Sequence, residues 1–241
     1  MRLLVTRPLD DARALAQALE AQGHEALIDP VLDIVPTTDE VPALEDVQAL
    51  LATSANGVRS FAALTPRRDL RLLAVGKATA EAAQAAGFTK VLCAEGDVAR
   101  LAPLAAETLD PKRGVLLHIV GRDTAGDLKG LLETRGFVVR RYVLYVAQAA
   151  RALAAETRAR LAADTLDGVL FFSPRSARIF LSLVEAANLA PHLQRLIAFC
   201  LSPAIAEAAR RVSWGDVRSA ARPDEAALLA AVEAASGPLK P

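Results

Sequence analysis

The chain has 241 residues, enough for one large domain or two smaller ones with a substantial apolar core. Lys plus Arg and Asp plus Glu balance at 28 each, so no global charge attracts nucleic acid or an anionic membrane. The longest uncharged stretch, residues 196–206, is about half of the ~20 residues that a membrane-spanning helix needs. No signal-peptide core begins the sequence, and the two cysteines lack disulfide or zinc spacing. We therefore expect a cytoplasmic protein.

Short apolar runs alternate along the chain with alanine-rich segments of helical spacing. A strand is predicted at 2–6, followed by a helix in which Leu15 and Leu19 are four residues apart and Gly23 is a C-cap. The later predicted strands share this continuous apolar character and lie at 25–29, 50–54, 72–76, 91–95, 115–121, 137–146, 169–173, 196–202 and 216–220. Continuously apolar strands between helices indicate parallel sheets covered on both faces. We predict an α/β fold.

The sequence also repeats itself. Residues 3–34 parallel 117–148, with Arg7 matching Arg122, and "LLATSANGVRSF" (50–61) parallels "VLFFSPRSARIF" (169–180). A third pair of blocks matches Gly76 with Ser202. The order is kept over about a hundred and twenty residues, far longer than a solenoid repeat. We predict two similar α/β halves. The alternative is that any alanine-rich chain of alternating strands and helices resembles itself.

Six turns follow the predicted strands and carry the candidate binding residues. In parallel sheets, ligands bind beyond the carboxyl ends of the strands, where helix N-termini present N–H groups. These turns combine Ser, Thr, Asn, Gly and Pro with scattered positive charge, as suits a ligand with several anionic groups. The candidate substrate-binding residues are Arg7, Pro8, Thr53, Ser54, Asn56, Gly76, Lys77, Thr79, Gly121, Arg122, Ser173, Pro174, Arg175 and Ser202. Alternatively, each hydroxyl or amide side chain in these turns is an ordinary N-cap.

Several common catalytic motifs are absent from the sequence. No dinucleotide fingerprint, Walker loop or nucleophile elbow follows a strand. The spacing of His24, His118 and His192 supports no metal site or triad, and we expect packing or surface roles, with His24 in a surface turn. Cys93 and Cys200 are interpreted as core residues. An enzyme of this kind would act mainly by holding its substrate in shape.

The sequence resembles the uroporphyrinogen-III synthase family over nearly its whole length. The resemblance is carried in order by "LLVTRP", "TSANGV", "AVGKATAEAAQAAGF", "GFVVRRYVLYVAQ" and "FFSPRSA". It implies two similar, interleaved, flavodoxin-like domains joined by a two-stranded connector, with a cleft between them. One domain would take residues 1–34 and 150–241 and the other 38–142, with connectors at about 35–37 and 143–149.

The resemblance also implies a reaction. Members of the family cyclise linear hydroxymethylbilane to uroporphyrinogen III with loss of water and inversion of ring D, which makes them lyases of heme biosynthesis. No metal or organic cofactor is implied, and we expect a monomer with no nucleic-acid partner. Tyr145 matches a tyrosine suggested to help the hydroxyl leave; alternatively it is a packed sheet tyrosine. Tyr142, three residues earlier in a strand, is expected on the opposite face.

One turn departs from the family pattern, and other functions stay open. The turn with Gly76 and Thr79 has Ser202 and Ile205 in its second copy, where the family often has a substrate-contacting threonine. Because isoleucine donates no hydrogen bond, that contact is absent or moved to Ser202. The main alternative function is a non-catalytic two-lobed binding protein for a small anion. A nucleotide-dependent transferase is a third possibility, but it lacks a glycine-rich phosphate loop.

Overall fold

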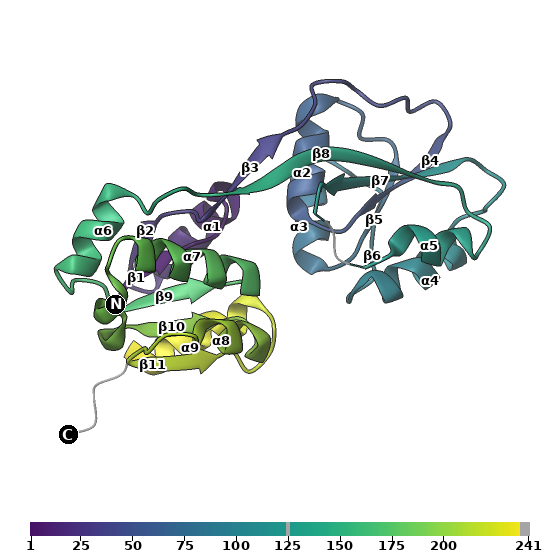
Figure 1. The fold of residues 1–241 in the computed structure, drawn as a ribbon. Helices are drawn as coiled ribbons and strands as arrows, with labels where there is room; N and C mark the ends of the chain where they lie inside the picture. The colour runs from purple at the N-terminus through teal and green to yellow at the C-terminus, as the bar shows by residue number, and fades with distance from the viewer. Residues whose placement is uncertain (124–125, 237–241) are drawn as a thin grey trace. The chain divides into compact units, whose positions relative to one another are not determined.

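Two sheets organise the chain, which we describe from a computed structural model covering residues 1–123 and 126–236 (Figure 1). The first sheet is parallel throughout, and its strands in spatial order are β11 (Asp216–Ser219), β10 (Ile197–Cys200), β9 (Gly168–Phe171), β1 (Arg2–Val5) and β2 (Glu25–Ile28). The strands of the second sheet, in spatial order, are β3 (Leu32–Pro36), β8 (Val139–Ala149), β7 (Val115–Gly121), β4 (Val47–Ala52), β5 (Arg71–Ala74) and β6 (Val91–Cys93). In this second sheet, the five neighbouring strands β8, β7, β4, β5 and β6 also pair in parallel.

Each sheet belongs to one of two compact units. The first unit comprises Met1–Asp33 and the chain from Gln148 onward, and the second comprises Ile34–Ala147. Both boundaries fall inside a strand, one within β3 and one within β8. These two strands are neighbours and antiparallel, since Ala150 N–H donates to the Val31 carbonyl at one end and Thr37 N–H donates to the Leu144 carbonyl at the other. The chain therefore passes between the units through two paired strands.

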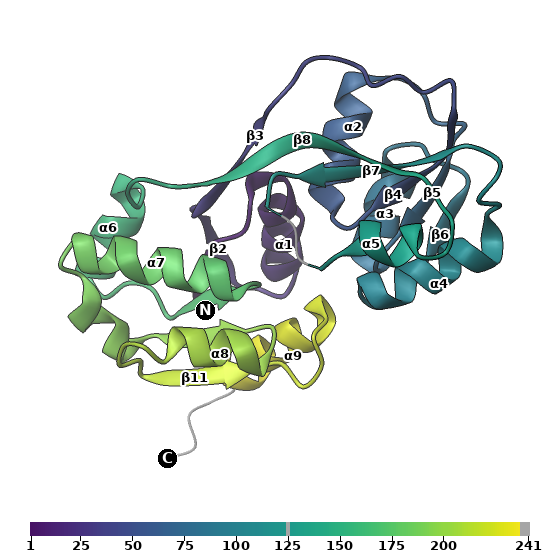
Figure 2. The ribbon, with the colours of Figure 1, turned by 45° about the vertical axis from the view of Figure 1, so that its right-hand side comes forward.

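Helices cover both faces of each sheet (Figures 1 and 2). In the first unit, α1 (Leu9–Ala21) and α9 (Glu225–Ser236) pack on one face, and α6 (Ala155–Ala162), α7 (Pro174–Ala186), the 3₁₀ helix η1 (Ala190–Arg195) and α8 (Pro203–Ala209) pack on the other. In the second unit, α2 (Ala55–Leu64) and α3 (Lys77–Ala85) pack on one face, and α4 (Val98–Thr108) and α5 (Leu128–Glu133) pack on the other. The α/β class predicted from the continuously apolar strands is confirmed.

The predicted duplication is visible in the strand order. When β1, β2, β9, β10 and β11 are matched with β7, β8, β4, β5 and β6, the two sheets have the same order. The helices match as well. On one face of the sheet, α1 and α9 of the first unit correspond to α5 and α4 of the second. On the other face, α7 and α8 of the first unit correspond to α2 and α3 of the second. The halves are therefore related by a circular permutation. The first unit has the flavodoxin-like order 2-1-3-4-5, and in the second unit, numbered from β4, the permuted order is 3-2-1-4-5, with β3 added at one edge.

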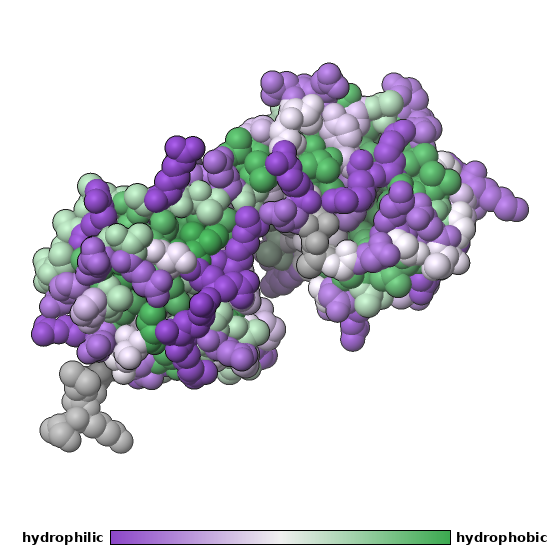
Figure 3. Space-filling model, in the orientation of Figure 1, coloured by the Kyte–Doolittle hydropathy of each residue, from purple (hydrophilic) through white to green (hydrophobic). Residues whose placement is uncertain are grey.

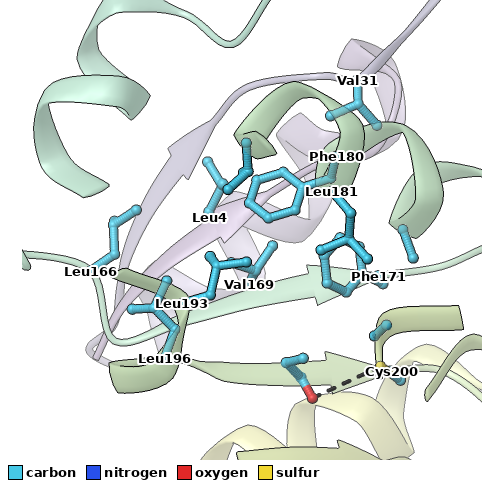
Figure 4. Close-up of a cluster of buried hydrophobic side chains, with 14 of the residues drawn as sticks. Leu4, Val31, Leu166, Val169, Phe171, Phe180, Leu181, Leu193, Leu196 and Cys200 are labelled. Carbon is cyan, nitrogen blue, oxygen red and sulfur yellow. Dashed lines mark hydrogen bonds between the residues drawn. The ribbon is translucent and has the colours of Figure 1, made fainter. Parts of the chain in front are cut away.

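An aromatic cluster anchors the core of the first unit (Figure 4). Phe171 of β9 and Phe180 of α7 are fully buried, with ring centroids 5.4 Å apart in an edge-on arrangement. The indole of Trp214 stacks on Phe180 with centroids 6.3 Å apart. Burial of each large apolar side chain stabilises the fold by about 1.5–3 kcal/mol. Cys200 belongs to the same core, and burial raises the pKa of its thiol to about 12.

One register shift changes the geometry of the second sheet. Val120 of β7 pairs with Val143 of β8, but the next residue, Gly121, pairs with Tyr145, so Leu144 is an extra residue in β8. Such a bulge reverses the alternation of side chains along the strand. Tyr142 and Tyr145 consequently pack against the same core cluster. Our expectation that Tyr142 lies on the opposite face was wrong, because it assumed an unbroken strand.

Polar side chains are prominent on the face of the molecule that Figure 3 shows. Hydrophilic side chains cover much of both units in the view of Figure 3, with smaller hydrophobic areas between them. None of the helices in the described ranges combines the length and the apolar character needed to cross a membrane. His24, expected in a surface turn, is instead buried, with its ring nitrogens 3.1 Å from the Met1 amino group and 3.0 Å from Glu233. It lies there because α9 covers the turn after α1.

Candidate active site

Both sheets contain a point where ligands commonly bind. In the second unit, β4 and β7 are neighbours, and the helices that follow them, α2 and α5, lie on opposite faces. In the first unit, β9 and β1 are neighbours, and the helices that follow them, α7 and α1, also lie on opposite faces of the sheet. At such a switch point the loops diverge and leave a crevice at the carboxyl ends of the strands. Four of the six turns predicted to bind substrate follow these strands, and the other two follow β5 and β10.

A pocket of about 320 Å³ occupies this position in the second unit. It contains four of the predicted site residues, which are Thr53, Ser54, Gly121 and Tyr145. Its other lining residues were not predicted and are Val75, Asp97, Val98, Val120, Asp123 and Gly126. The signal for Asp97 was present in the sequence as an acidic residue before an apolar helical run; its carboxylate caps α4 by accepting from the N–H groups of Ala99 and Arg100. That pattern indicated a helix start, not a pocket.

Ser54 connects the start of a helix with the tyrosine of the pocket. Its Oγ accepts a hydrogen bond from the Gly57 N–H at 3.1 Å, so it is the N-cap of α2. The same Oγ lies 2.8 Å from the phenol oxygen of Tyr145. A serine hydroxyl has two acceptor sites and one proton. Ser54 can therefore accept from Gly57 and donate to the phenol oxygen of Tyr145.

Tyr145 has both features considered in the sequence. Its ring is packed in the core of the second unit, with only 8 % of the residue exposed. Its hydroxyl end reaches the pocket, where Ser54 holds it. A ring fixed by packing and a hydroxyl fixed by a hydrogen bond keep a proton donor in one orientation. The arrangement suits a reaction in which a leaving group accepts a hydrogen bond.

A buried histidine lies behind the pocket. The Nε2 atom of His118, on β7, is 3.3 Å from the Thr53 hydroxyl, and its Nδ1 atom is buried without a hydrogen-bond partner within the described structure. Burial, with a smaller contribution from the positive charge of Arg141, lowers the pKa of His118 to about 4. The imidazole is therefore neutral near pH 7, and its contacts place it against the wall of the pocket.

The other predicted residues of the second unit lie on the same edge of its sheet but do not line the pocket. Gly76 begins α3 with an extended backbone, and its carbonyl accepts from the Thr79 N–H at 3.1 Å. Thr79 itself is 5 % exposed. Lys77 extends into solvent beside Glu81, whereas the Asn56 side chain accepts from Arg59. The Arg122 N–H donates to the Tyr145 carbonyl at 2.8 Å.

The predicted residues of the first unit occupy the equivalent edge of the other sheet. Ser173 caps α7 by accepting from the Ser176 N–H at 3.0 Å, which is the arrangement that Ser54 has in α2. The remaining helix-start residues here are Pro8 before α1, Pro174 and Arg175 in the first turn of α7, and Ser202 before α8. Ser202 makes no capping bond through its side chain. Ile205 is 3 % exposed and belongs to the core, so its side chain packs inward.

Arg7 is held by acidic neighbours. Its guanidinium forms ion pairs with Glu225 at 2.7 Å and Asp11 at 3.4 Å, and it lies 4.2 Å from the centre of the Phe172 ring. These contacts connect the turn after β1 with the start of α9. A carboxylate ligand would have to compete with Glu225 for the same guanidinium.

The residues that the structure describes hold no cluster of three His, Cys, Asp or Glu side chains able to bind a metal ion. The pocket instead combines hydroxyl groups, helix N-termini and an oriented phenol at a switch point. Two α/β units related by a circular permutation, with a candidate ligand pocket at the switch point of the second sheet, define the class of this protein.

Comparison with known proteins identifies the family. A family model described as uroporphyrinogen-III synthase HemD matches residues 13–230, so the chain belongs to the uroporphyrinogen-III synthase family. Among solved structures, uroporphyrinogen-III synthetase from Helicobacter pylori is similar, with a TM-score of 0.64, 16 % identity and coverage of 98 % of this chain and 100 % of that one. A mutant uroporphyrinogen III synthase from Thermus thermophilus has a TM-score of 0.54, 22 % identity and 98 % coverage of both chains. Comparison with curated protein sequences gave no match.

The family model confirms the family and the function predicted from the sequence, and the fold agrees with that of both structures. Nothing in them favours the alternative of a non-catalytic binding protein.

Proposed function

We propose that this chain is a lyase that cyclises hydroxymethylbilane to uroporphyrinogen III, with Tyr145 donating a hydrogen bond to the departing hydroxyl. In this reaction the C–O bond of the terminal hydroxymethyl group breaks. The hydroxyl and the pyrrole N–H proton leave together as water, which gives an azafulvene. The electrophilic carbon is then attacked by the ring at the other end of the chain. The closure without inversion is spontaneous, so the enzyme has to select one geometry.

The observation that carries this proposal is the 2.8 Å contact between Ser54 Oγ and the Tyr145 phenol at the pocket. A hydroxyl is a poor leaving group unless a donor stabilises the negative charge that develops on its oxygen. A phenol can donate a hydrogen bond to that oxygen as the charge develops. Donation from Ser54 to the phenol oxygen strengthens the phenol as a donor. Ser54 therefore supports Tyr145 in addition to capping α2.

The charge around the pocket favours the reacting end of the substrate. Asp97 and Asp123 line the pocket, and carboxylates repel the acetate and propionate groups of a tetrapyrrole. The same negative charge favours an azafulvene, which becomes cationic on protonation. We propose that the substrate carboxylates contact the predicted turn residues, whose positive charges and helix N-termini suit anions. The two units would then serve as the domains expected at 1–34 with 150–241 and at 38–142, in a cytoplasmic monomer.

A coupled assay tests the function. Hydroxymethylbilane is generated in the presence of the protein, the products are oxidised, and the type I and type III isomers are separated. We expect isomer III from the wild-type protein, and a fall in kcat of about 100-fold for Tyr145→Phe with an unchanged fold. Tyr142→Phe is the matched control, because that phenol donates to the Glu40 carbonyl at 2.7 Å and is absent from the pocket lining. Isomer I alone from the folded wild-type protein would contradict the proposal.

A further inference from the structure

We propose that Gly121 is a positioning residue for Tyr145, and that its missing side chain provides the space against which the phenol ring rests. The inference rests on the proposed function, since it explains how the phenol is oriented. Gly121 was predicted as a substrate contact, and the structure brings it into the pocket lining together with Tyr145. Its role here is exerted through the tyrosine.

Space explains why residue 121 is glycine. A Cβ atom added to Gly121 would lie 2.7 Å from both Cε2 and Cζ of Tyr145 and 3.0 Å from its hydroxyl oxygen. Carbon atoms in contact are normally about 3.5–4.0 Å apart. The backbone gives no competing reason for glycine, because Gly121 lacks the positive φ seen at Gly23, Gly87, Gly114, Gly126 and Gly136. Any side chain at 121 would therefore meet the reactive end of the tyrosine ring.

The tyrosine has little freedom to avoid such a clash. Gly121 and Tyr145 are paired across the register shift in β7 and β8. The Arg122 N–H donates to the Tyr145 carbonyl at 2.8 Å, which holds the backbone of β8 beside the glycine. The ring itself packs in the core of the second unit. A swing of the whole side chain about χ1 is the remaining response, because rotation of the ring about its own axis leaves Cζ and the hydroxyl oxygen in place. Such a swing would move the phenol oxygen away from Ser54.

The first test compares two alanine variants with similar clashes. In Gly121→Ala the new Cβ meets Tyr145, whereas in Gly168→Ala it lies 2.7 Å from the Phe199 ring and 2.9 Å from the Ile197 carbonyl in the first unit. We expect kcat of Gly121→Ala to fall about as far as that of Tyr145→Phe, with a smaller change in KM. Gly168→Ala should lower the unfolding midpoint and leave kcat within about twofold. A double variant, Gly121→Ala with Tyr145→Phe, should turn over about as slowly as Tyr145→Phe alone, since the donor is already lost.

The second test reads the tyrosine directly. The chain has two tyrosines, so in a Tyr142→Phe background Tyr145 gives a single signal from ring-labelled ¹³C-tyrosine. We expect this resonance to move in Gly121→Ala and in Ser54→Ala and to stay in place in Gly168→Ala. An unmoved resonance with unchanged kcat in folded Gly121→Ala would overturn the inference. Full activity of Tyr145→Phe would instead overturn the proposed function, whatever the resonance does.

Stability provides a further test that does not need active enzyme. If the clash with the phenol ring is the cause, Gly121→Ala should lower the unfolding midpoint less in a Tyr145→Leu background, because the shorter side chain makes room for the methyl group. Equal losses in both backgrounds would mean that the added methyl group clashes elsewhere, and the positioning role of Gly121 would be wrong.

Discussion

Ser54 and Tyr145, 91 residues apart in the sequence, lie with their side-chain oxygens 2.8 Å apart. The contact spans the centre of the second sheet, since Ser54 follows β4, Tyr145 belongs to β8, and both strands pair with β7. Ser54 also accepts the Gly57 N–H at the start of α2. One hydroxyl therefore supports both a helix terminus and the phenol of the pocket.

We predict that Ser54→Ala lowers both stability and rate. Loss of the N-cap should reduce the free energy of unfolding by about 1 kcal/mol, and loss of the contact with Tyr145 should reduce kcat. The control is Asp127→Ala, which removes a comparable N-cap bond to Gly130 at 2.9 Å in the same unit. It should lose similar stability without the fall in kcat. Urea unfolding and the isomer assay measure the two effects, and equal kcat values for both variants would contradict the coupling.

A second prediction concerns Arg7 and Glu225. The carboxylate of Glu225, 45 % exposed, lies 2.7 Å from the Arg7 guanidinium, so it occupies a position that a substrate carboxylate bound to Arg7 would need. Replacing it in Glu225→Gln should leave Arg7 more available to an anionic substrate. If Arg7 binds substrate, we expect KM to fall several-fold, with a stronger dependence on salt because screening weakens the new attraction. Glu156→Gln, in an exposed pair with Arg160, is the control. An unchanged KM would remove Arg7 from the binding residues.

Much of the fold could be predicted because its signals are local. Continuously apolar strands such as 115–121 and 169–173 indicated buried parallel strands, and the matched turns at Ser54 and Ser173 indicated a duplication. Those two serines cap equivalent helices, so the repeat in the sequence corresponds to a repeat in the structure. The circular permutation follows from the boundaries of the units, because the block that begins the first unit (residues 3–34) matches the block that ends the second (residues 117–148).

The pocket could be predicted only in part, because it depends on register and packing. Leu144 has no feature that marks it as the extra residue of a bulge, yet the bulge decides that Tyr142 and Tyr145 share a face. Asp97 was identifiable as a helix cap, but its place in the pocket depends on how α4 packs on the sheet. Distances between elements of this kind are tertiary information that spacing along one segment does not contain.

A third prediction tests the aromatic core of the first unit. Phe180 is fully buried and its ring contacts those of Phe171 and Trp214, so Phe180→Ala should lower the free energy of unfolding by about 3–5 kcal/mol. Trp214 is the single tryptophan of the chain, and its fluorescence reports unfolding of this unit in urea. Leu9→Ala, at a residue that is 46 % exposed, should cost far less. Similar losses for the two variants would mean that Phe180 is not central to this core.

A fourth prediction follows from the buried His118. Its pKa is about 4 in the folded protein and near the ordinary 6.5 in the unfolded chain, so the unfolded state binds the proton more readily. Stability is therefore complete above about pH 6.5, declines as the pH falls toward about 4, and then levels off. The difference of about 2.5 pH units corresponds to a loss of about 3 kcal/mol.

The measurement compares urea unfolding of the wild type with His118→Met from about pH 7 to about pH 4. The methionine variant should lack this part of the decline, because it carries no titrating group between β7 and its neighbours. His24, His192 and all the carboxylates are common to both proteins, so their titration cancels in the difference. Parallel pH profiles for the two proteins would show that His118 becomes protonated without cost, and that it is more accessible to water than its 4 % exposure indicates.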